Sequence, residues 1–337
     1  MYIARPRRTD TSGASHIPFI VRDPDRKAPV LIVTSDSTWQ AYNHAGENPA
    51  APLTGRSLYG NGTTSAFTFN LATRARAVSY NRPFVTRKHI PQTWLFNAEY
   101  PLMRWLERNG YDVDYASCAD IDATPELLTG RDVVIVHGHS EYWSAAMRDA
   151  LEDARDASVH ILALSGNSVF WRITYAADRR SFSCWKDTHD GALGPTGVYG
   201  GTWRDTRAFN PDRRPENELF GQFFRVNGIR EDDLVVPDTY AAHPIWRDTT
   251  VATLTSGQTR TYENVLGFEW DEDRVQERPA SWIQMSSTTV PVTGMLADED
   301  GGTYTGSGTV THHLGAYRAA SGAVVFGAGM NQLAWAL

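Results

Sequence analysis

Cysteine, long apolar runs and positive net charge are all scarce in this sequence. Its two cysteines, Cys118 and Cys184, stand far apart, so they form neither a disulfide framework nor a CxxC metal site. No apolar run reaches membrane-spanning length, and Arg5, Arg7 and Arg8 leave no room for an apolar signal core at the start. The formal net charge of -7 at pH 7 disfavours nucleic acid and anionic membranes as partners. These absences predict a cytoplasmic protein.

Aromatic residues, by contrast, are plentiful. The 337 residues include 11 tryptophans and 14 tyrosines, which suits aromatic-lined pockets, although most such residues pack in cores. A chain of this length can bury a full core and hold one large domain or two. Residues 1–28 are polar and Arg-rich and resemble the tail of another domain. Residues 46–77 are rich in turn formers without a sustained period, which predicts a long surface excursion.

The most informative stretch is residues 132–143. Its first half is a run of β-branched apolar residues, which predicts a strand buried on both faces of a parallel sheet. Met147, Leu151 and Ala154 then follow at helical spacing. The junction therefore places polar side chains at the carboxyl end of a central strand, the edge where open α/β sheets bind ligands. These side chains belong to His139, Ser140, Glu141 and Tyr142.

Three interpretations of this junction are open from the residues alone. Ser140 can cap the helix, with Glu141 complementing the helix dipole in the first turn. Residues 138–142 also match G-x-S-x-G with Tyr142 in place of the last glycine, which suggests a metal-free serine hydrolase using Ser140. A bulky tyrosine weighs against that strained turn. In the third interpretation, His139 and Glu141 point into a pocket and handle a metal or a water molecule.

Strand and helix patterns alternate over the first half of the chain. The patterns predict strands at 31–34, 111–115, 132–136 and 159–164, and helices over 100–109 and around 125–128. This order predicts an α/β fold with a doubly wound, mostly parallel sheet. Tyr42 and Asn167 follow strands at the same edge as His139. Short alternating runs after residue 175 predict a β-rich insertion or lobe over about 176–320, whose last strand returns to the sheet.

Eight motifs give the sequence a family resemblance. They are residues 37–43 (STWQAYN), 57–59 (SLY), 78–83 (VSYNRP), 138–143 (GHSEYW), 166–171 (GNSVFW), 203–205 (WRD), 214–217 (RPEN) and 267–269 (GFE). From about Ile17 to Leu337 the chain resembles the C-terminal catalytic domain of the N,N-dimethylformamidase large (beta) subunit and its relatives. The resemblance implies an amidohydrolase acting on linear amides. It also implies a core similar to class I glutamine amidotransferases and flavodoxin-like proteins, within a catalytic domain at 29–337.

The resemblance further implies a mononuclear ferric iron held by two tyrosines and one glutamate. Carried over residue by residue, the ligands are Tyr42, Tyr59 and Glu141, with Tyr80 as the rival for the second tyrosine. Phenolate and carboxylate oxygens are hard donors, and their three negative charges suit a ferric ion. An adjacent cation would also be needed to deprotonate phenols, whose ordinary pKa is about 10. Three protein ligands leave positions for a carbonyl and a water, so the metal would act as a Lewis acid.

Three more residues match family positions with chemical roles. His139 and Asn167 match positions that polarise or position the substrate carbonyl, and Glu269 matches that of a proposed water-activating base. Without the resemblance, Glu269 would be expected to face solvent, because it stands between Phe268 and Trp270 in an alternating run. Further contacts to the substrate are expected from Asn43, Tyr142 and Trp171.

The resemblance also bears on partners. It implies a small-molecule amide substrate, a homo-oligomer and a small helical partner subunit, with residues 1–28 as the remnant of a family β-domain. A non-catalytic glycan- or polymer-binding module built on the tryptophan-rich lobe is the remaining alternative. Cys118 is expected to be inert, because no glycine-flanked turn or downstream His-x-Glu accompanies it. His312 and His313 are not expected to share a ligand, because neighbours in a strand face opposite sides.

Overall fold

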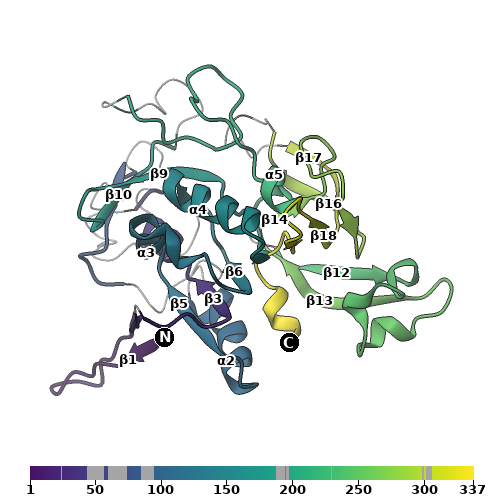
Figure 1. The fold of residues 1–337 in the computed structure, drawn as a ribbon, viewed down its shortest axis with the longest axis horizontal. Coiled ribbons are helices and arrows are strands. Elements are labelled where there is room, and N and C mark those ends of the chain that lie inside the picture. The colour runs from purple at the N-terminus through teal and green to yellow at the C-terminus, as the bar shows by residue number, and fades with distance from the viewer. Residues whose placement is uncertain are drawn as a thin grey trace.

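A seven-stranded mixed sheet forms the centre of the molecule in the computed structural model (Figure 1). The structure describes residues 1–23, 25–43, 57–59, 74–84, 95–186, 194, 197–228, 230–297, 300 and 306–337. In order across the sheet, the strands are β15 (Ile283–Gln284), β18 (Gly315–Arg318), β19 (Val324–Gly327), β8 (His160–Ser165), β6 (Val133–Gly138), β3 (Val30–Val33) and β5 (Val113–Ala116). Neighbouring strands from β19 to β5 are parallel, whereas β18 pairs antiparallel with both β19 and β15.

Alternation of side chains along β6 buries both faces of this sheet. Val134 and Val136 belong to the same core cluster as Met147 and Leu151 of helix α4 (Ala145–Asp156). On the opposite face, Ile135 packs in a cluster with residues of α2 (Tyr100–Arg108). A run of β-branched apolar residues therefore stabilises a central strand from both sides, as the sequence predicts.

The individual elements of the first half form close to where they are predicted. Helix α2 ends at Arg108, and Gly110 follows with a φ of 77°, a left-handed conformation that suits glycine after a helix. The segment predicted as helical around 125–128 is a 3₁₀ turn at Pro125–Leu127. The remaining helices are α1 (Asp36–Ala41), α3 (Cys118–Ala123), α5 (Asn217–Phe220), a π-helix at Leu95–Glu99, and 3₁₀ turns at Asp238–Tyr240, Pro244–Trp246, Thr250–Thr253 and Leu333–Ala336.

The prediction of a doubly wound, flavodoxin-like or class I glutamine amidotransferase-like α/β fold is wrong. Strand residues outnumber helical ones, at 32% against 21%, and the described residues contain only five α-helices. After β8 the chain continues into antiparallel and mixed pairings instead of further helical crossovers. Apolar runs identify buried strands but do not specify how the strands are connected. The alternation of strands and helices in the first half therefore does not predict the architecture of the whole chain.

Most of the other strands form four smaller sheets. The first pairs β4 (Ala77–Ser79), β10 (Ser181–Ser183), β9 (Trp171–Tyr175) and β7 (Tyr142–Ser144), and the second pairs β14 (Trp270–Glu272), β11 (Phe223–Val226), β16 (Thr288–Met295) and β17 (Gly306–His312). Two ribbons are β12 (Asp232–Pro237) with β13 (Thr259–Gly267), and β1 (Tyr2–Ala4) with β2 (Ile17–Phe19). Figure 1 shows the strand-rich second half beside the helix-bearing first half.

Two further predictions concern the excursion over residues 46–77 and membrane-spanning segments. Most of the predicted excursion over 46–77 lies outside the described residues, apart from residues 57–59 and 74–77. Across the described part of the chain, no helix has the length and apolar character needed to span a membrane.

Candidate functional site

The junction after β6 differs from the predicted strand-to-helix turn. Short strand β7 follows Glu141, so α4 begins at Ala145, with the hydroxyl of Ser144 accepting the Met147 N–H. Ser144, not Ser140, is therefore the N-cap, and the capping interpretation of Ser140 is wrong. Gly138 has a φ of 72°, and a Cβ there would lie 2.6 Å from Cγ of Glu99, so only glycine fits this turn.

Ser140 also lacks the setting of a nucleophile. Its hydroxyl and carbonyl both accept hydrogen bonds from Nε1 of Trp143, at 2.9 Å and 3.0 Å, and its N–H donates to the hydroxyl of Ser165. Among the described residues, no histidine or carboxylate forms a hydrogen bond with the Ser140 hydroxyl. The serine-hydrolase alternative therefore gains no support from this geometry.

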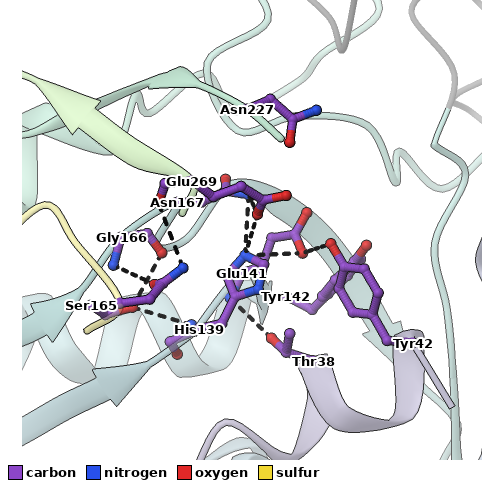
Figure 2. Close-up of polar contacts among 12 residues, drawn as sticks. Thr38, Tyr42, His139, Glu141, Tyr142, Ser165, Gly166, Asn167, Asn227 and Glu269 are labelled. Atoms are coloured by element: carbon purple, nitrogen blue, oxygen red, sulfur yellow. Dashed lines mark hydrogen bonds and ion pairs between the residues drawn. The ribbon is translucent and has the colours of Figure 1, made fainter. Parts of the chain in front are cut away.

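Three oxygen donors predicted from distant motifs meet beside this junction (Figure 2). The hydroxyl of Tyr42, at the C-cap of α1, donates to Oε2 of Glu141 at 2.9 Å. The hydroxyl of Tyr59 lies 2.6 Å from that of Tyr42 and 3.2 Å from Oε1 of Glu141. The two phenol rings stack with centroids 4.1 Å apart. The backbone N–H of Glu141 donates to Oγ1 of Thr38, which ties the carboxylate's backbone to the helix that carries Tyr42.

The protonation of this cluster is governed by burial and by neighbouring charges. Burial raises the pKa of both Tyr42 and Tyr59 well above 10, and the nearby Glu141 carboxylate raises them further. Burial also raises the pKa of Glu141, although Lys186 and His139 oppose that shift. These three buried groups therefore ionise less readily than in water when the charged side chains of the protein are their only electrostatic partners. A metal cation at this point would reverse the shifts, so the donor set fits a hard, highly charged ion.

This arrangement is unlike a site built from histidines, cysteines and carboxylates. Within the described ranges, no group of three or more His, Cys, Asp or Glu side chains is arranged to hold a metal. A metal centre here would depend on its tyrosine hydroxyls.

His139, Asn167 and Glu269 form a second group against the first. Nε2 of His139 lies 2.9 Å from Oε2 of Glu269, 3.5 Å from Oε2 of Glu141 and 3.3 Å from Nδ2 of Asn167. Nδ2 of Asn167 also donates to Oε2 of Glu269 at 3.3 Å. Burial lowers the pKa of His139, but the Glu269 and Glu141 carboxylates outweigh it, so the net pKa shift is upward. Figure 2 shows both carboxylates at the Nε2 end of the His139 ring.

Both partners of His139 lie on backbone in the left-handed region. Asn167 and Glu269 each have a φ of 49°, which is uncommon for residues other than glycine. Glu269 sits in the turn between β13 and β14, so the alternative expectation of a solvent-facing strand position is wrong. Such outliers persist only where the surroundings hold them, and they cluster at functional sites.

The three residues expected to contact substrate differ in their placement. The hydroxyl of Tyr142 lies 2.5 Å from that of Tyr59, which brings it into the acidic cluster. Trp171 borders the same region, with Nζ of Lys186 4.5 Å from its ring centroid. Asn43 directs its side-chain N–H to the carbonyl of Pro83 at 2.9 Å.

Lys186 is the residue that sequence reasoning missed. Nζ lies 2.6 Å from the hydroxyl of Tyr142 and 3.6 Å from the ring centroid of Tyr59, and burial lowers the pKa of Lys186 to about 8. The excess of acidic oxygens predicts a compensating cation, but Lys186 stands in no motif that would identify it. Its position depends on contacts with β7 and β9, which sequence spacing does not reveal.

Other candidates lie in separate surroundings. Tyr80 donates to Oδ2 of Asp36 at 2.7 Å and lies 3.1 Å from the hydroxyl of Tyr175. Cys118 is buried beside them, and burial raises the pKa of its thiol well above 9, which agrees with an inert role. His312 contacts the carbonyl of Ala328, whereas His313 lies near Asp273, so these neighbours face apart as predicted.

The comparisons with known proteins agree on one relationship. Residues 1–337 match the family described as N,N-dimethylformamidase beta subunit-like, C-terminal. The N,N-dimethylformamidase beta subunit of Alcaligenes sp is 28% identical over 195 residues, which cover 50% of this chain and 25% of the relative. That of Paracoccus aminophilus is 27% identical over 184 residues, covering 47% and 24%. The match thus spans about a quarter of the length of these curated relatives.

Proposed function

The chain belongs to the N,N-dimethylformamidase beta subunit-like family, and on that premise we propose that it hydrolyses the C–N bond of a small amide or formamide. One observation carries the proposal. The buried oxygens of Tyr42, Tyr59 and Glu141 form one hydrogen-bonded cluster, directly against His139 and Glu269. Acid oxygens suited to a cation thus lie beside a carboxylate suited to proton transfer.

We propose that Tyr42, Tyr59 and Glu141 hold a mononuclear ferric iron. The hard oxygen donors of all three groups, and their contacts within one cluster, support this choice. When bound, the ion supplies Lewis-acid polarisation of an amide carbonyl without any redox change. Tyr59 is preferred to Tyr80, because Tyr59 contacts both Tyr42 and Glu141, whereas Tyr80 contacts Asp36 and Tyr175.

The proton transfers are assigned to Glu269. Its carboxylate takes a proton from water as the water oxygen bonds to the carbonyl carbon, and it returns that proton to the nitrogen as the C–N bond breaks. The products are a carboxylic acid, formate in the case of a formamide, and an amine. His139 and Asn167 both contact Glu269 and keep its carboxylate in place. Their N–H groups are also suited to stabilise negative charge on the carbonyl oxygen.

The substrate is expected to be small. His139, Glu141 and Asn167 are almost fully buried, and the side chain of Glu269 is 11% exposed. Tyr142 and Trp171 provide aromatic surface beside the cluster, which suits the apolar substituents of a substituted amide. The matched relatives are named beta subunits, and we propose that this chain likewise works in an oligomer with a further, small helical subunit.

The test combines metal analysis with amine release. The purified protein should contain about one iron per chain, show a visible phenolate-to-iron absorption band, and release amine from dimethylformamide or another formamide. Tyr42→Phe should weaken the band and Glu141→Ala should remove the iron, each with loss of hydrolysis. Full hydrolysis by protein stripped of iron would overturn the metal assignment, and absence of hydrolysis by iron-loaded protein on a panel of small amides would overturn the reaction.

A further inference from the structure

The loops that carry Asn167 and Glu269, the two residues in contact with His139, are held by the loop after β19. Three loops meet behind Asn167 and Glu269: residues 165–168 after β8, residues 267–270 between β13 and β14, and residues 329–332 after β19. Their backbones approach so closely that a Cβ on Gly166 would lie 2.7 Å from the carbonyl oxygen of Glu269 and 2.9 Å from Cα of Met330. The third loop therefore packs directly against both of the others.

Asn331 connects the two loops that carry Asn167 and Glu269. Oδ1 of Asn331 accepts the N–H of Gly166 at 2.8 Å. Nδ2 points at the carbonyl oxygens of Phe268, 3.4 Å away, and Glu269, 3.5 Å away. The side chain is 1% exposed, so water is not available to replace these contacts. The Asn331 side chain thus hydrogen-bonds to the backbone of both loops. In one loop it contacts Gly166, the neighbour of Asn167, and in the other it contacts Glu269 itself.

Gln332 adds a second contact from the same loop. Its Oε1 accepts the N–H of Phe268 at 3.0 Å. This approach is possible because residue 267 is glycine, since a Cβ there would lie 1.7 Å from the same Oε1. The loop after β19 therefore holds residues 267–269 through both a side-chain amide oxygen and the Asn331 amide group.

We propose that Asn331 is a positioning residue for the reaction, and that its amide sets the separation of Asn167 and Glu269 around His139. This inference rests on the proposed function for its consequence, but the geometry stands by itself. No hydrogen bond joins Asn331 to His139, Glu141 or either tyrosine among the described contacts, so Asn331 acts only through the backbone it holds. An error of about 1 Å in such a constellation is enough to cost about 100-fold in rate.

Two substitutions of Asn331 distinguish a hydrogen-bonding role of its side chain from a purely space-filling role. Asn331→Ala removes both contacts. Asn331→Asp is isosteric and still accepts the Gly166 N–H, but it cannot donate to the carbonyls of Phe268 and Glu269. The matched control is Asn210→Ala, because Asn210 is also buried and also donates to two backbone carbonyls, those of Trp203 and Asp205.

The expected result is a selective loss of turnover. Both Asn331 variants should lower kcat for formamide hydrolysis about 30-fold or more with KM within about threefold, whereas Asn210→Ala should change neither by more than about threefold. Iron content and the phenolate-to-iron band should stay unchanged, because Asn331 contacts the backbone of Gly166, Phe268 and Glu269 and not the proposed ligands. A kcat for both Asn331 variants equal to that of Asn210→Ala would overturn the proposal.

A second readout does not depend on activity. Hydrogen–deuterium exchange should become faster in residues 165–170 and 266–271 together in either Asn331 variant, and not in the Asn210 control. If the wild-type protein hydrolyses no amide, the proposed function fails, yet this exchange pattern still decides the bridging role. Unchanged exchange in both segments, or an equal rise throughout the chain, would show that Asn331 does not connect them. If Asn331→Ala does not fold, the same comparison is made with Asn331→Asp.

Discussion

Two tyrosine–carboxylate clusters share helix α1, one member at each end. The first, here the outer-edge cluster, consists of Asp36, Tyr80 and Tyr175, and the second, the junction cluster, of Tyr42, Tyr59 and Glu141. Both carboxyl groups are buried, and each cluster has two phenols with one carboxyl group. Residue types alone therefore do not distinguish them.

The difference lies in what else the carboxylate contacts. Oδ1 of Asp36 accepts the backbone N–H of Cys118 at 2.7 Å and the hydroxyl of Thr34 at 2.8 Å, so it connects α1 to the start of α3. The side-chain oxygens of Glu141 meet two phenols and lie 3.5 Å from Nε2 of His139. Backbone and hydroxyl donors satisfy the outer-edge carboxylate, whereas acidic hydroxyls surround the junction carboxylate. This comparison suits the structural role of the first cluster and the binding role that we propose for the second.

The sharpest test removes each carboxylate in turn. Glu141→Ala should lower kcat/KM about 1,000-fold or more, because it removes a proposed ligand of a Lewis acid worth several kcal/mol. Measured on metal-free protein, its unfolding free energy should fall by about 1 kcal/mol, because the hydroxyls of Tyr42 and Tyr59 still hydrogen-bond to each other. Asp36→Ala should do the reverse, losing about 3 kcal/mol of stability by leaving buried donors unpaired. Urea unfolding and amine release measure both quantities. Equal losses of activity per folded molecule would remove the distinction.

Replacing one tyrosine of each cluster by phenylalanine should give a smaller difference in activity between the clusters. Tyr59→Phe should lower kcat/KM about 100-fold and weaken the visible absorption band. Tyr80→Phe loses one hydrogen bond to Asp36, so it should cost about 1 kcal/mol of stability and leave kcat/KM within about threefold. Visible spectra and kinetics of the two variants, measured side by side, decide whether Tyr59 or Tyr80 is the second tyrosine ligand. A band that survives in Tyr59→Phe but disappears in Tyr80→Phe would reverse the assignment.

The smallest effect is a dependence of stability on pH. Burial raises the pKa of Asp36 above its ordinary value of 3.8, although hydrogen bonds from Tyr80, Cys118 and Thr34 oppose the shift. The folded chain thus holds this proton more tightly than the unfolded chain, and the resulting stability is present below pH 3.8 and lost as pH rises through the folded pKa. Asp36→Asn stays uncharged, so its stability relative to wild type should increase from pH 4 upward, by at most about 1.4 kcal/mol per pH unit.

Urea unfolding of both proteins between pH 4 and pH 8 gives this difference directly. A wild-type protein that gains stability over Asp36→Asn as pH rises would mean that the folded state favours the charged aspartate. The outer-edge cluster would then hold its charge without any cation, and the contrast between the two clusters would have to be explained otherwise.

Sequence patterns predicted the strands better than their connections. The β-branched residues of β6 and the apolar residues of β3 and β8 can only be buried on both faces of a sheet, so their positions follow from composition. The predicted return of the last strand to the sheet is confirmed by β19, but nothing local specifies that β8 is its neighbour or that the chain after β9 turns into antiparallel pairings. Those choices depend on contacts between residues far apart in sequence, which explains why the predicted fold class failed.

The candidate site shows the same limit. The motifs around Tyr42, Tyr59 and Glu141 suggested donors that the structure brings into contact, and their metal-binding role stays a prediction. Glu269 was expected either as a base or as a solvent-facing strand residue, and only coordinates show the turn that directs it to His139. Lys186 and Asn331 had no sequence signal at all, because each acts through neighbours from other segments.

The long sequence separation between β8 and β19 has a consequence for synthesis of the chain. β19 pairs in parallel with β8, with Val325 opposite Ile161, and the loop after it braces residues 166 and 269. A nascent chain on the ribosome can therefore present Tyr42, His139 and Glu141 long before the strand beside β8 has been translated. Until then one edge of the parallel strands stays open to unwanted pairing, so demand for chaperones should persist until β19 has been translated.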